Sequence, residues 1–420
     1  MGFAGLLGIP VALASVAYLW LIHEVQHILF DALPNELGIG GLPWWYLLAV
    51  LTIGGAATGL AVTRLRGNGG HRPLAGLGGG EPITPDALLG VLAAAVASLG
   101  FGAVLGPEAP LLAMGTALGL AVARLGKFSK SELSVVAAAG AFGALSALLG
   151  GPLIAAILVL ELAVIASRPL IAIVPGLFSA GIGYLVFAET NQWAGAPVPS
   201  FSLGLTPVDE VQLIDLVIGV LGVLVIAILI RAVLAAARSI ESRAMKLAKP
   251  VLTTAAAGLA VAVVAVAFRA LTGENVDLVL FSGQESAGTV LTDGTQWGVA
   301  VLLAVVGAKS LAYALSLGGG FRGGLIFPAI FLGSALAALL EDLPGGASAP
   351  ALATIAIAAS VAAILRLPFT AAAMAVLLVG SSPAAMVLAS VGAVLGLLVE
   401  MALDRRTREA EEKSVVAAAT

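Results

Sequence analysis

The chain has 420 residues, of which 60% are hydrophobic and only 10% are charged, and its formal net charge is −4. Soluble domains carry about 25% charged residues, so the composition excludes an ordinary soluble protein, and the lack of a basic excess gives no support to a nucleic-acid partner. The chain contains no cysteine, which excludes disulfides, iron–sulfur clusters and thiolate zinc sites.

Ten apolar stretches follow one another along the chain. Most approach or exceed the roughly 20 residues that a helix needs to cross the hydrocarbon of a bilayer, and several could hold two helices. They lie at 3–22, 43–63, 86–105, 133–165, 169–188, 211–237, 250–272, 296–315, 324–340 and 350–403. The pattern predicts an all-α, polytopic membrane protein with one transmembrane domain at 1–403 and a short charged tail at 404–420.

The first apolar stretch ends in "HEVQH". His23, Glu24 and His27 fit the H-E-x-x-H pattern, in which a helix presents two zinc-binding imidazoles and a general-base glutamate. A zinc peptidase needs a third protein ligand, and the candidates are His71 and Asp293, the latter in a polar stretch expected to be a loop. An intramembrane zinc protease is therefore one alternative. The other interpretation is that these polar residues mark the end of the first membrane helix.

Two segments interrupt the hydrophobic pattern where a helix must begin. Pro107 and Pro110 cannot both lie in a helix interior, but both fit a first turn, where the N–H groups have no intrahelical partner. Apolar runs flank 106–110 on both sides, so this helix is expected to begin at membrane depth, inside protein or beside a watery cavity. Glycines at 318–320, 323 and 324, ahead of Pro328, predict a second start of the same kind.

Such helix starts suit an anion. Each carries about half a positive charge together with unpaired N–H groups, and those of Leu325, Ile326 and Phe327 are expected to aim at one place. The glycine-rich stretch 67–71 predicts a third start. Several starts that converge would hold an anion weakly enough for it to leave again.

Glu108 has two interpretations. A glutamate in a first turn can simply complement the helix dipole. Alternatively, an intramembrane carboxylate is costly and usually functional, and because a carboxylate imitates a small anion, Glu108 could occupy the anion's own place and act as a gate.

The chain also contains an internal repeat. The segment "PLLAMGTALG" from Pro110 can be laid over "PAIFLGSALA" from Pro328, and the stretch after Pro152 resembles the one after Pro368 at nearly the same offset. Repeated halves with interrupted helices in corresponding positions indicate a transport site near the midplane. The predicted halves are roughly 40–190 and 211–403.

Together these segments resemble the CLC family of chloride channels and proton-coupled chloride transporters, from roughly residue 60 to 400. The family's "GREGP" resembles 106–110, its "G-x-F-x-P" region resembles 324–328, its "GSGIP" resembles 67–71, and its "APLAGxLFxxE" is similar to "GPLIAAILVLE", which ends at Glu161.

The resemblance implies an anion-transport domain of two inverted repeats of tilted and broken helices, and a homodimer in which each subunit has its own pore. It implies that chloride or another small inorganic anion is held by the amides of Leu325 and Ile326, that Glu108 is the gating residue, and that there is no enzyme activity, cofactor or metal. The implied anion-binding residues are Gly67, Asn68, Gly69, Gly106, Glu108, Gly324, Leu325, Ile326 and Phe327.

Several positions depart from the family pattern. Pro107 replaces an arginine, Arg322 stands where a proline is usual, and Asn68 replaces a serine. Arg322 could attract anions or could pair with a nearby acid. Leu162 replaces the second of two glutamates, the first of which Glu161 matches, on the inner proton route; this favours passive conductance over proton-coupled exchange, which stays the alternative.

The tyrosine that usually closes the inner end of the pore has no evident counterpart, because every tyrosine precedes the last hydrophobic segment. The tyrosines are Tyr18, Tyr46, Tyr184 and Tyr313.

Basic residues gather in four groups, which the positive-inside tendency places in the cytoplasm together with the C-terminus. The chain is therefore expected to be a multi-pass protein of the cell (plasma) membrane, in contact with lipid. The groups are Arg64, Arg66 and Arg72; Arg124, Lys127 and Lys130; the residues from Arg231 to Lys249; and Arg405, Arg406 and Arg408.

Overall fold

In a computed structural model, residues 5–77, 82–125, 128–165, 170–194 and 201–419 are described, and this part of the chain is almost entirely helical. Seven of its helices are long and apolar enough to cross a membrane. The only β-type pairing within these ranges is one antiparallel bridge, between Gly106 and Gly324. The predicted all-α, polytopic membrane architecture is confirmed.

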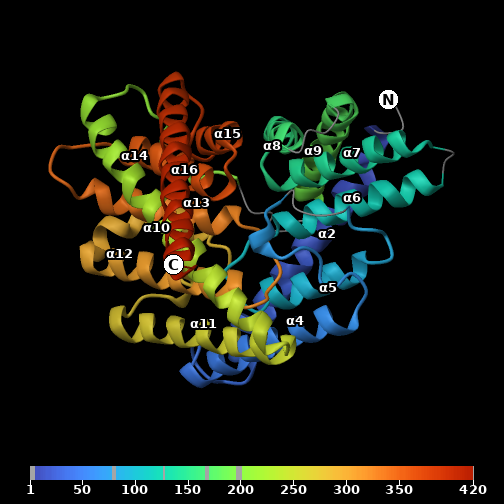
Figure 1. Ribbon diagram of the computed structural model, residues 1–420, viewed down its shortest axis with the longest axis horizontal. Helices are drawn as coiled ribbons and strands as arrows, with labels where there is room; N and C mark the ends of the chain where they lie inside the picture. Colours follow the sequence, from blue (N-terminus) through green and yellow to red (C-terminus); the bar gives the residue numbers. More distant parts are fainter. Residues whose placement is uncertain (1–4, 78–81, 126–127, 166–169, 195–200, 420) are drawn as a thin grey trace.

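The first half of the chain forms helices α2 to α9 (Figure 1). They are α2 (Gly8–His27), continued by the π-helical turn η1 (Ile28–Ala32) and α3 (Leu33–Glu36), then α4 (Trp44–Arg64), the 3-10 turn η2 (Pro73–Ala75), α5 (Leu88–Leu99), α6 (Glu108–Arg124), α7 (Lys130–Leu148), α8 (Pro152–Ile165), the 3-10 turn η3 (Leu170–Ala172) and α9 (Ile173–Ala194).

The second half forms helices α10 to α16. They are α10 (Leu213–Leu247), α11 (Pro250–Thr272), the 3-10 turn η4 (Val276–Leu278), α12 (Ser286–Gly318), α13 (Ile326–Glu341), α14 (Ala349–Leu365), α15 (Pro368–Val379) and α16 (Pro383–Ala419).

The two halves pack in the same way. Helix α7 contacts α6, α8 and α9, and α14 contacts α13, α15 and α16; α2 contacts α7 and α9 as α10 contacts α14 and α16. Two pairs of corresponding helices also join the halves, α4 with α11 and α8 with α15, and the first of these pairs runs along the lower edge of Figure 1. In this correspondence α2 is the counterpart of α10.

The aligned residues occupy equal positions in equal helices. Pro110 and Pro328 are each the third residue of their helix, α6 and α13. Pro152 and Pro368 are the first residues of α8 and α15, where the missing N–H costs nothing. The expectation that helices begin near Pro110 and Pro328 is confirmed; the sequence analysis made no such prediction for Pro152 and Pro368, where helices also begin.

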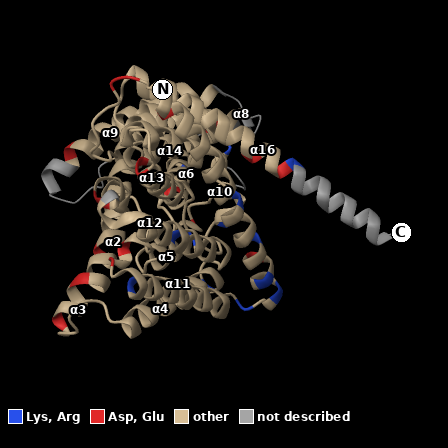
Figure 2. Ribbon diagram, turned by 90° about the vertical axis from the view of Figure 1, so that its left-hand side faces the viewer, with Lys and Arg blue, Asp and Glu red and all other residues tan. Residues whose placement is uncertain are grey.

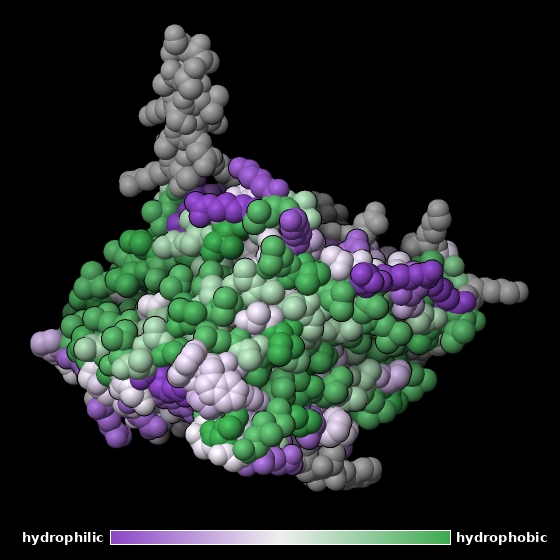
Figure 3. Space-filling model, turned by 90° about the horizontal axis from the view of Figure 1, so that it is seen from below, coloured by the Kyte–Doolittle hydropathy of each residue, from purple (hydrophilic) through white to green (hydrophobic). Residues whose placement is uncertain are grey.

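Charge and hydropathy define two faces. In Figure 2 the acidic residues of α2, α3 and α9 lie toward one side and the basic residues near the end of α10 toward the other. In Figure 3 a broad apolar surface separates two polar margins, as expected for a surface in contact with lipid. We refer to these sides as the acidic face and the basic face. Helix α4 ends at Arg64 and α10 ends just after Lys246, so both end on the basic face.

Two local expectations are wrong. The stretch 67–71 does not begin an α-helix, because residues 67–70 all have φ between +49° and +84°, which a right-handed helix cannot accommodate; it forms a turn instead. The stretch around Asp293 is not a loop but part of α12, which kinks at Gly298 (φ +76°) rather than ending there.

The crossing of α6 and α7 yields a testable prediction. A Cβ atom at Gly115 would meet the carbonyl oxygen of Gly140 and lie 2.8 Å from the Cβ of Ala144, whereas one at Gly307 would meet nothing within 4 Å. Gly115→Ala should therefore lower the free energy of unfolding by about 1–3 kcal/mol, the usual cost of overpacking. The measurement is the melting temperature of the detergent-purified protein, with Gly307→Ala as the matched control. Equal melting temperatures for the two variants would contradict this packing.

Candidate functional site

The two broken segments meet in the centre of the molecule. The Gly106 N–H donates to the Gly324 carbonyl (3.0 Å), and the Gly324 N–H donates to the Gly106 carbonyl (2.5 Å). This bridge sets the first turn of α6 beside the first turn of α13. The expected convergence of 106–110 and 323–328 is confirmed, and both segments are buried in protein.

Glu108 reaches across from α6 to cap α13. Its carboxylate is fully buried, and Oε1 accepts hydrogen bonds from the Ile326 N–H (3.1 Å) and the Phe327 N–H (2.9 Å). Oε2 has no hydrogen-bond partner within the described residues. The carboxylate thus occupies the place where unpaired amides and the helix dipole favour a negative charge.

The glycines on either side of the bridge make room for this carboxylate. A Cβ atom at Gly106 or at Gly324 would lie against the Glu108 carboxyl oxygens. A larger residue at either position would displace the carboxylate from the amides of α13. Glycine is therefore required at both positions, because a side chain packs closely against the backbone there.

Leu325 is the residue before the first turn of α13, and its carbonyl accepts a hydrogen bond from the Tyr313 hydroxyl (2.7 Å). Tyr313 is fully buried. No role was predicted for Tyr313. It precedes the last hydrophobic segment, and its position in the sequence does not reveal its neighbours in space.

The turn at 67–70 lies against the segment before α13, although it begins no helix. The backbone carbonyl of Asn68 accepts a hydrogen bond from Arg322 Nη2 (3.3 Å), and the Arg322 backbone N–H donates to Ser98 Oγ (2.9 Å). The three glycine-rich stretches of the sequence therefore belong to one contact network, which runs from Asn68 through Arg322 to Gly324.

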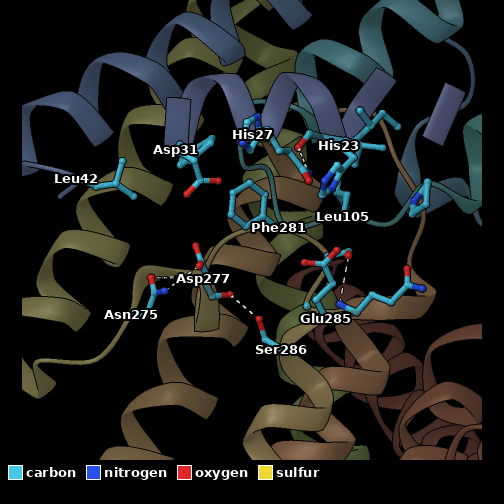
Figure 4. Close-up of a pocket in the computed structure, with 18 of the residues that line it drawn as sticks. His23, His27, Asp31, Leu42, Leu105, Asn275, Asp277, Phe281, Glu285 and Ser286 are labelled. Atoms are coloured by element: carbon cyan, nitrogen blue, oxygen red, sulfur yellow. Dashed lines mark hydrogen bonds between the residues drawn. The ribbon is translucent and has the colours of Figure 1, made fainter. Parts of the chain in front are cut away.

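A cavity of about 570 Å³ opens on the acidic face and ends beside this site. We call it the vestibule. Figure 4 shows His23 of α2 beside Leu105, with Phe281 between the two walls. Leu105 and Pro107 also line the cavity, and they lie one to three residues before Glu108 in the chain. The vestibule therefore ends beside the segment that carries Glu108, although Glu108 itself is not among its lining residues.

The vestibule carries more negative than positive side chains. Asp31, Asp277 and Glu285 line it, and Arg269 is the one arginine among its lining residues. Burial raises the pKa of Asp277; the Asn275 amide, 2.8 Å away, opposes the rise, and the negative charge of Asp31 adds to it.

The "HEVQH" motif lies in this vestibule. His23 and His27 line it, and α2 ends at His27. No cluster of three His, Cys, Asp or Glu side chains that could hold a metal ion occurs within the described ranges, and Asp293 lies elsewhere, in α12. The zinc-protease alternative gains no support. The histidines do not mark the end of the first membrane helix either, because η1 and α3 continue α2 in one apolar span as far as Glu36.

A buried lysine holds one wall of the vestibule. Lys309 Nζ donates to the carbonyls of Leu280 (2.8 Å) and Phe281 (3.2 Å) and lies 4.5 Å from the ring centroid of Phe331. The Phe281 ring in turn packs edge-on against Phe30 at 4.8 Å. Lys309 was not singled out from the sequence, since a lone lysine in an apolar helix gives no sign of its partners.

Glu161 joins the two halves at another point. Its carboxylate accepts hydrogen bonds from the backbone N–H groups of Phe369 (2.8 Å) and Thr370 (2.7 Å), and from the Thr370 hydroxyl. Glu161 of α8 therefore caps the N-terminus of α15. The next residue, Leu162, packs against the hydrophobic core.

Comparisons with known proteins agree with this architecture. The sequence profile of the family described as Voltage gated chloride channel matches residues 49–401. The chain is 29% identical over 352 residues to the "Putative ion-transport protein YfeO" of Escherichia coli, covering 80% of this chain and 77% of that protein. The protein of the same name from Escherichia fergusonii is 28% identical over the same share of both chains.

Solved structures resemble the fold. A slow cyanobacterial Cl⁻/H⁺ antiporter superposes with a TM-score of 0.79 at 17% identity, covering 96% of this chain and 94% of that one. A CLC-type fluoride/proton antiporter gives a TM-score of 0.68 at 19% identity, with 94% and 95% of the two chains covered. A eukaryotic CLC transporter gives 0.72 at 18% identity, with 95% and 71% covered. The predicted arrangement of tilted and broken helices is confirmed at the level of the fold.

The Glu161 cap can be tested by substitution. Glu161→Ala should lower the free energy of unfolding by about 1–2 kcal/mol, because the first N–H groups of α15 lose their acceptor. The measurement is thermal unfolding in detergent. Glu189→Ala removes an exposed glutamate from α9 and is the control, expected to melt like the wild type. A Glu161→Ala protein as stable as this control would show that the cap contributes nothing.

Proposed function

The chain belongs to the voltage gated chloride channel (CLC) family, and from this premise we propose that it conducts a small inorganic anion passively, with Glu108 as the gate. Members of this family are channels and transporters, so the protein is a membrane anion channel or transporter and not an enzyme. The proposed anion-binding residues are those that the resemblance implied. Within this set, the N–H groups of Ile326 and Phe327 are the ones that donate to Glu108.

One observation carries the proposal. A buried carboxylate accepts hydrogen bonds from the first amides of a helix that begins inside the protein, and the residue before it, Pro107, lines a cavity open to one face. A chloride ion carries the same charge as the carboxylate and accepts the same N–H donors, so the two compete for one place. Two hydrogen bonds from α13 hold the carboxylate there and Oε2 has no partner in the described residues, so few contacts across the two halves must break for it to leave.

Passive conduction is preferred to exchange on the basis of Leu162. Proton-coupled transport requires a titratable relay from the gate to the opposite face, and an apolar leucine packed on the core cannot carry a proton. The neighbouring Glu161 is committed to the cap of α15. Proton-coupled exchange is kept as the second candidate because two of the structural neighbours are described as antiporters.

The assembly and topology follow the same reasoning. We expect a homodimer with one pathway per subunit, surrounded by the lipid of the cell membrane. The basic residues near the ends of α4 and α10 support a cytoplasmic location for the basic face, and the basic residues at 405–408 support the same location for the C-terminus.

The gate is tested by anion flux from reconstituted vesicles. Glu108→Gln should raise the passive flux of chloride at neutral pH by about tenfold, because a neutral amide binds the Ile326 and Phe327 N–H groups less well by about 1.4 kcal/mol. It should also flatten the pH dependence of the flux. Glu189→Gln, on the exposed side of α9, is the control and should behave like the wild type.

The same vesicles separate the two candidates. Fluxes of chloride, fluoride and nitrate are measured with and without a proton gradient. Passive conduction predicts that a proton gradient drives no anion uphill. Uphill movement of an anion would establish exchange. An unchanged flux in Glu108→Gln at every pH would contradict the gating role of Glu108.

The acidic vestibule generates a second functional prediction. As the pH falls, Asp277 loses its charge at a higher pH than an ordinary aspartate, because its pKa is raised by burial. Anion entry from the acidic face should therefore rise on acidification, and Asp277→Asn should raise it about twofold at neutral pH and low salt.

The control for Asp277→Asn is ionic strength. Salt near ~0.5 M shortens the screening length and should remove most of the difference between the two proteins. A difference that persists unchanged at high salt would show that the substitution acts through the local fold and not through charge.

A further inference from the structure

Arg322 is a buried cation without a carboxylate. Its residue is 7% exposed, and no acid lies within ion-pair distance of it in the described part of the chain. The guanidinium instead donates from Nη1 to the carbonyls of Gly320 (3.0 Å) and Phe321 (3.4 Å), and from Nη2 to that of Asn68 (3.3 Å). The pairing with a nearby acid that the sequence left open is not formed.

The hydrogen bonds of Arg322 do not exhaust its donors. A guanidinium has five N–H groups, and three carbonyl contacts leave two of them free. Nε has no partner, although it is buried. Nε–H and one N–H of Nη2 therefore remain available, and a charged guanidinium N–H is a strong donor to an anion.

A buried lysine provides a useful contrast. Lys309 has no acid within ion-pair distance in the described residues either, but two carbonyls and the face of Phe331 engage its ammonium group. The ammonium group of a buried lysine that only anchors a loop can therefore find partners for its N–H groups in this fold. Arg322 retains both a full charge and unused donors, which a purely structural role does not require.

Arg322 lies between the bridging glycines and the turn at 67–70, on the side of Glu108 that faces the basic residues. It lies two residues before Gly324, so its Cα is at most about 7 Å from that of the bridging glycine. On its other side is the 67–70 turn, with Gly69 close to Nε. The turn follows the exposed Arg64 and Arg66 and precedes Arg72, which pairs with Glu241 near the end of α10.

We propose that Arg322, together with the 67–70 turn, forms a second anion site on the basic side of Glu108, where the free N–H groups of the guanidinium hold a small monovalent anion. This inference rests on the proposed function. The neighbouring polar groups are already committed, since the Asn68 carbonyl accepts from Arg322 and the Tyr313 hydroxyl donates to Leu325, so the guanidinium carries the free donors at this point. An anion that leaves the Glu108 position toward the basic face would next meet this guanidinium.

Halide binding to the purified protein tests the proposal. Isothermal titration with bromide, in a buffer whose only other anion is gluconate, gives a dissociation constant for each variant. Arg322→Met keeps the length of the side chain but removes charge and donors, and it should raise the constant by about tenfold or more. Arg322→Lys, which keeps the charge, should raise it by much less. Arg243→Met removes one exposed arginine from α10 on the same face and should leave it unchanged.

A second measurement needs no variant. Crystals of the wild-type protein grown in bromide should show an anomalous peak within hydrogen-bond distance of Arg322 Nε. A peak at the amides of Ile326 and Phe327 alone would overturn the proposal, and so would equal bromide affinities in Arg322→Met and the wild type. Size-exclusion chromatography reports whether Arg322→Met folds. If it does not, the bromide crystals and the affinity of Arg322→Lys test the proposal instead.

The outcomes separate this inference from the proposed function. If the wild type conducts chloride but Arg322→Met binds bromide as tightly as the wild type, the Arg322 site is contradicted and the proposed conduction is not. Bromide bound at Arg322 in a protein that shows no anion flux removes the proposed function and leaves the site. Loss of bromide affinity together with a reduced chloride flux in Arg322→Met supports both.

Discussion

The pairing of Gly106 with Gly324 is the contact on which the rest of the site depends. Backbone that leaves a helix at membrane depth must find hydrogen-bond partners inside the protein, because lipid offers none. The two broken segments satisfy one another through reciprocal bonds. Once they are joined, the first turns of α6 and α13 lie side by side, and the side chain of Glu108 is long enough to reach the free amides of the other half.

The chain accommodates its buried charges in different ways, and these show which of them are structural. Glu400 contacts two arginines, and Asp215 accepts a hydrogen bond from the Ser348 N–H; both are committed to holding helices together. Glu108, Arg322 and Glu400 each keep one buried side-chain atom without a partner in the described residues, but Glu400 forms ion pairs, whereas the side chains of Glu108 and Arg322 hydrogen-bond only to backbone groups. A buried charge without an ion partner is costly, and both of these charges belong to the segments that meet at the bridge.

Much of this arrangement was predictable from proline and glycine alone. Pro110 and Pro328 mark helix starts because a proline ring excludes them from a helix interior, and their equal positions revealed the repeat. The same reasoning failed at 67–71, because glycine permits a helix start and a left-handed turn equally well, and the sequence does not say which is used. The cap of α15 by Glu161 and the contact of Arg322 with Asn68 join residues more than 200 positions apart, and no local pattern encodes such pairs.

The fixed charges on the two sides of Glu108 differ in sign, and this difference bears on how the gate would work. The vestibule on the acidic face carries three carboxylates against one arginine, whereas the opposite side offers Arg322 and the exposed arginines near the 67–70 turn. On the proposed function, an anion is stabilised on the basic side and repelled on the acidic side, so the Glu108 carboxylate meets its competitor mainly from the basic side. Protonation from the vestibule and displacement from the basic side then act on the same two hydrogen bonds. A single side chain at the bridge can thus respond to conditions on both faces of the membrane.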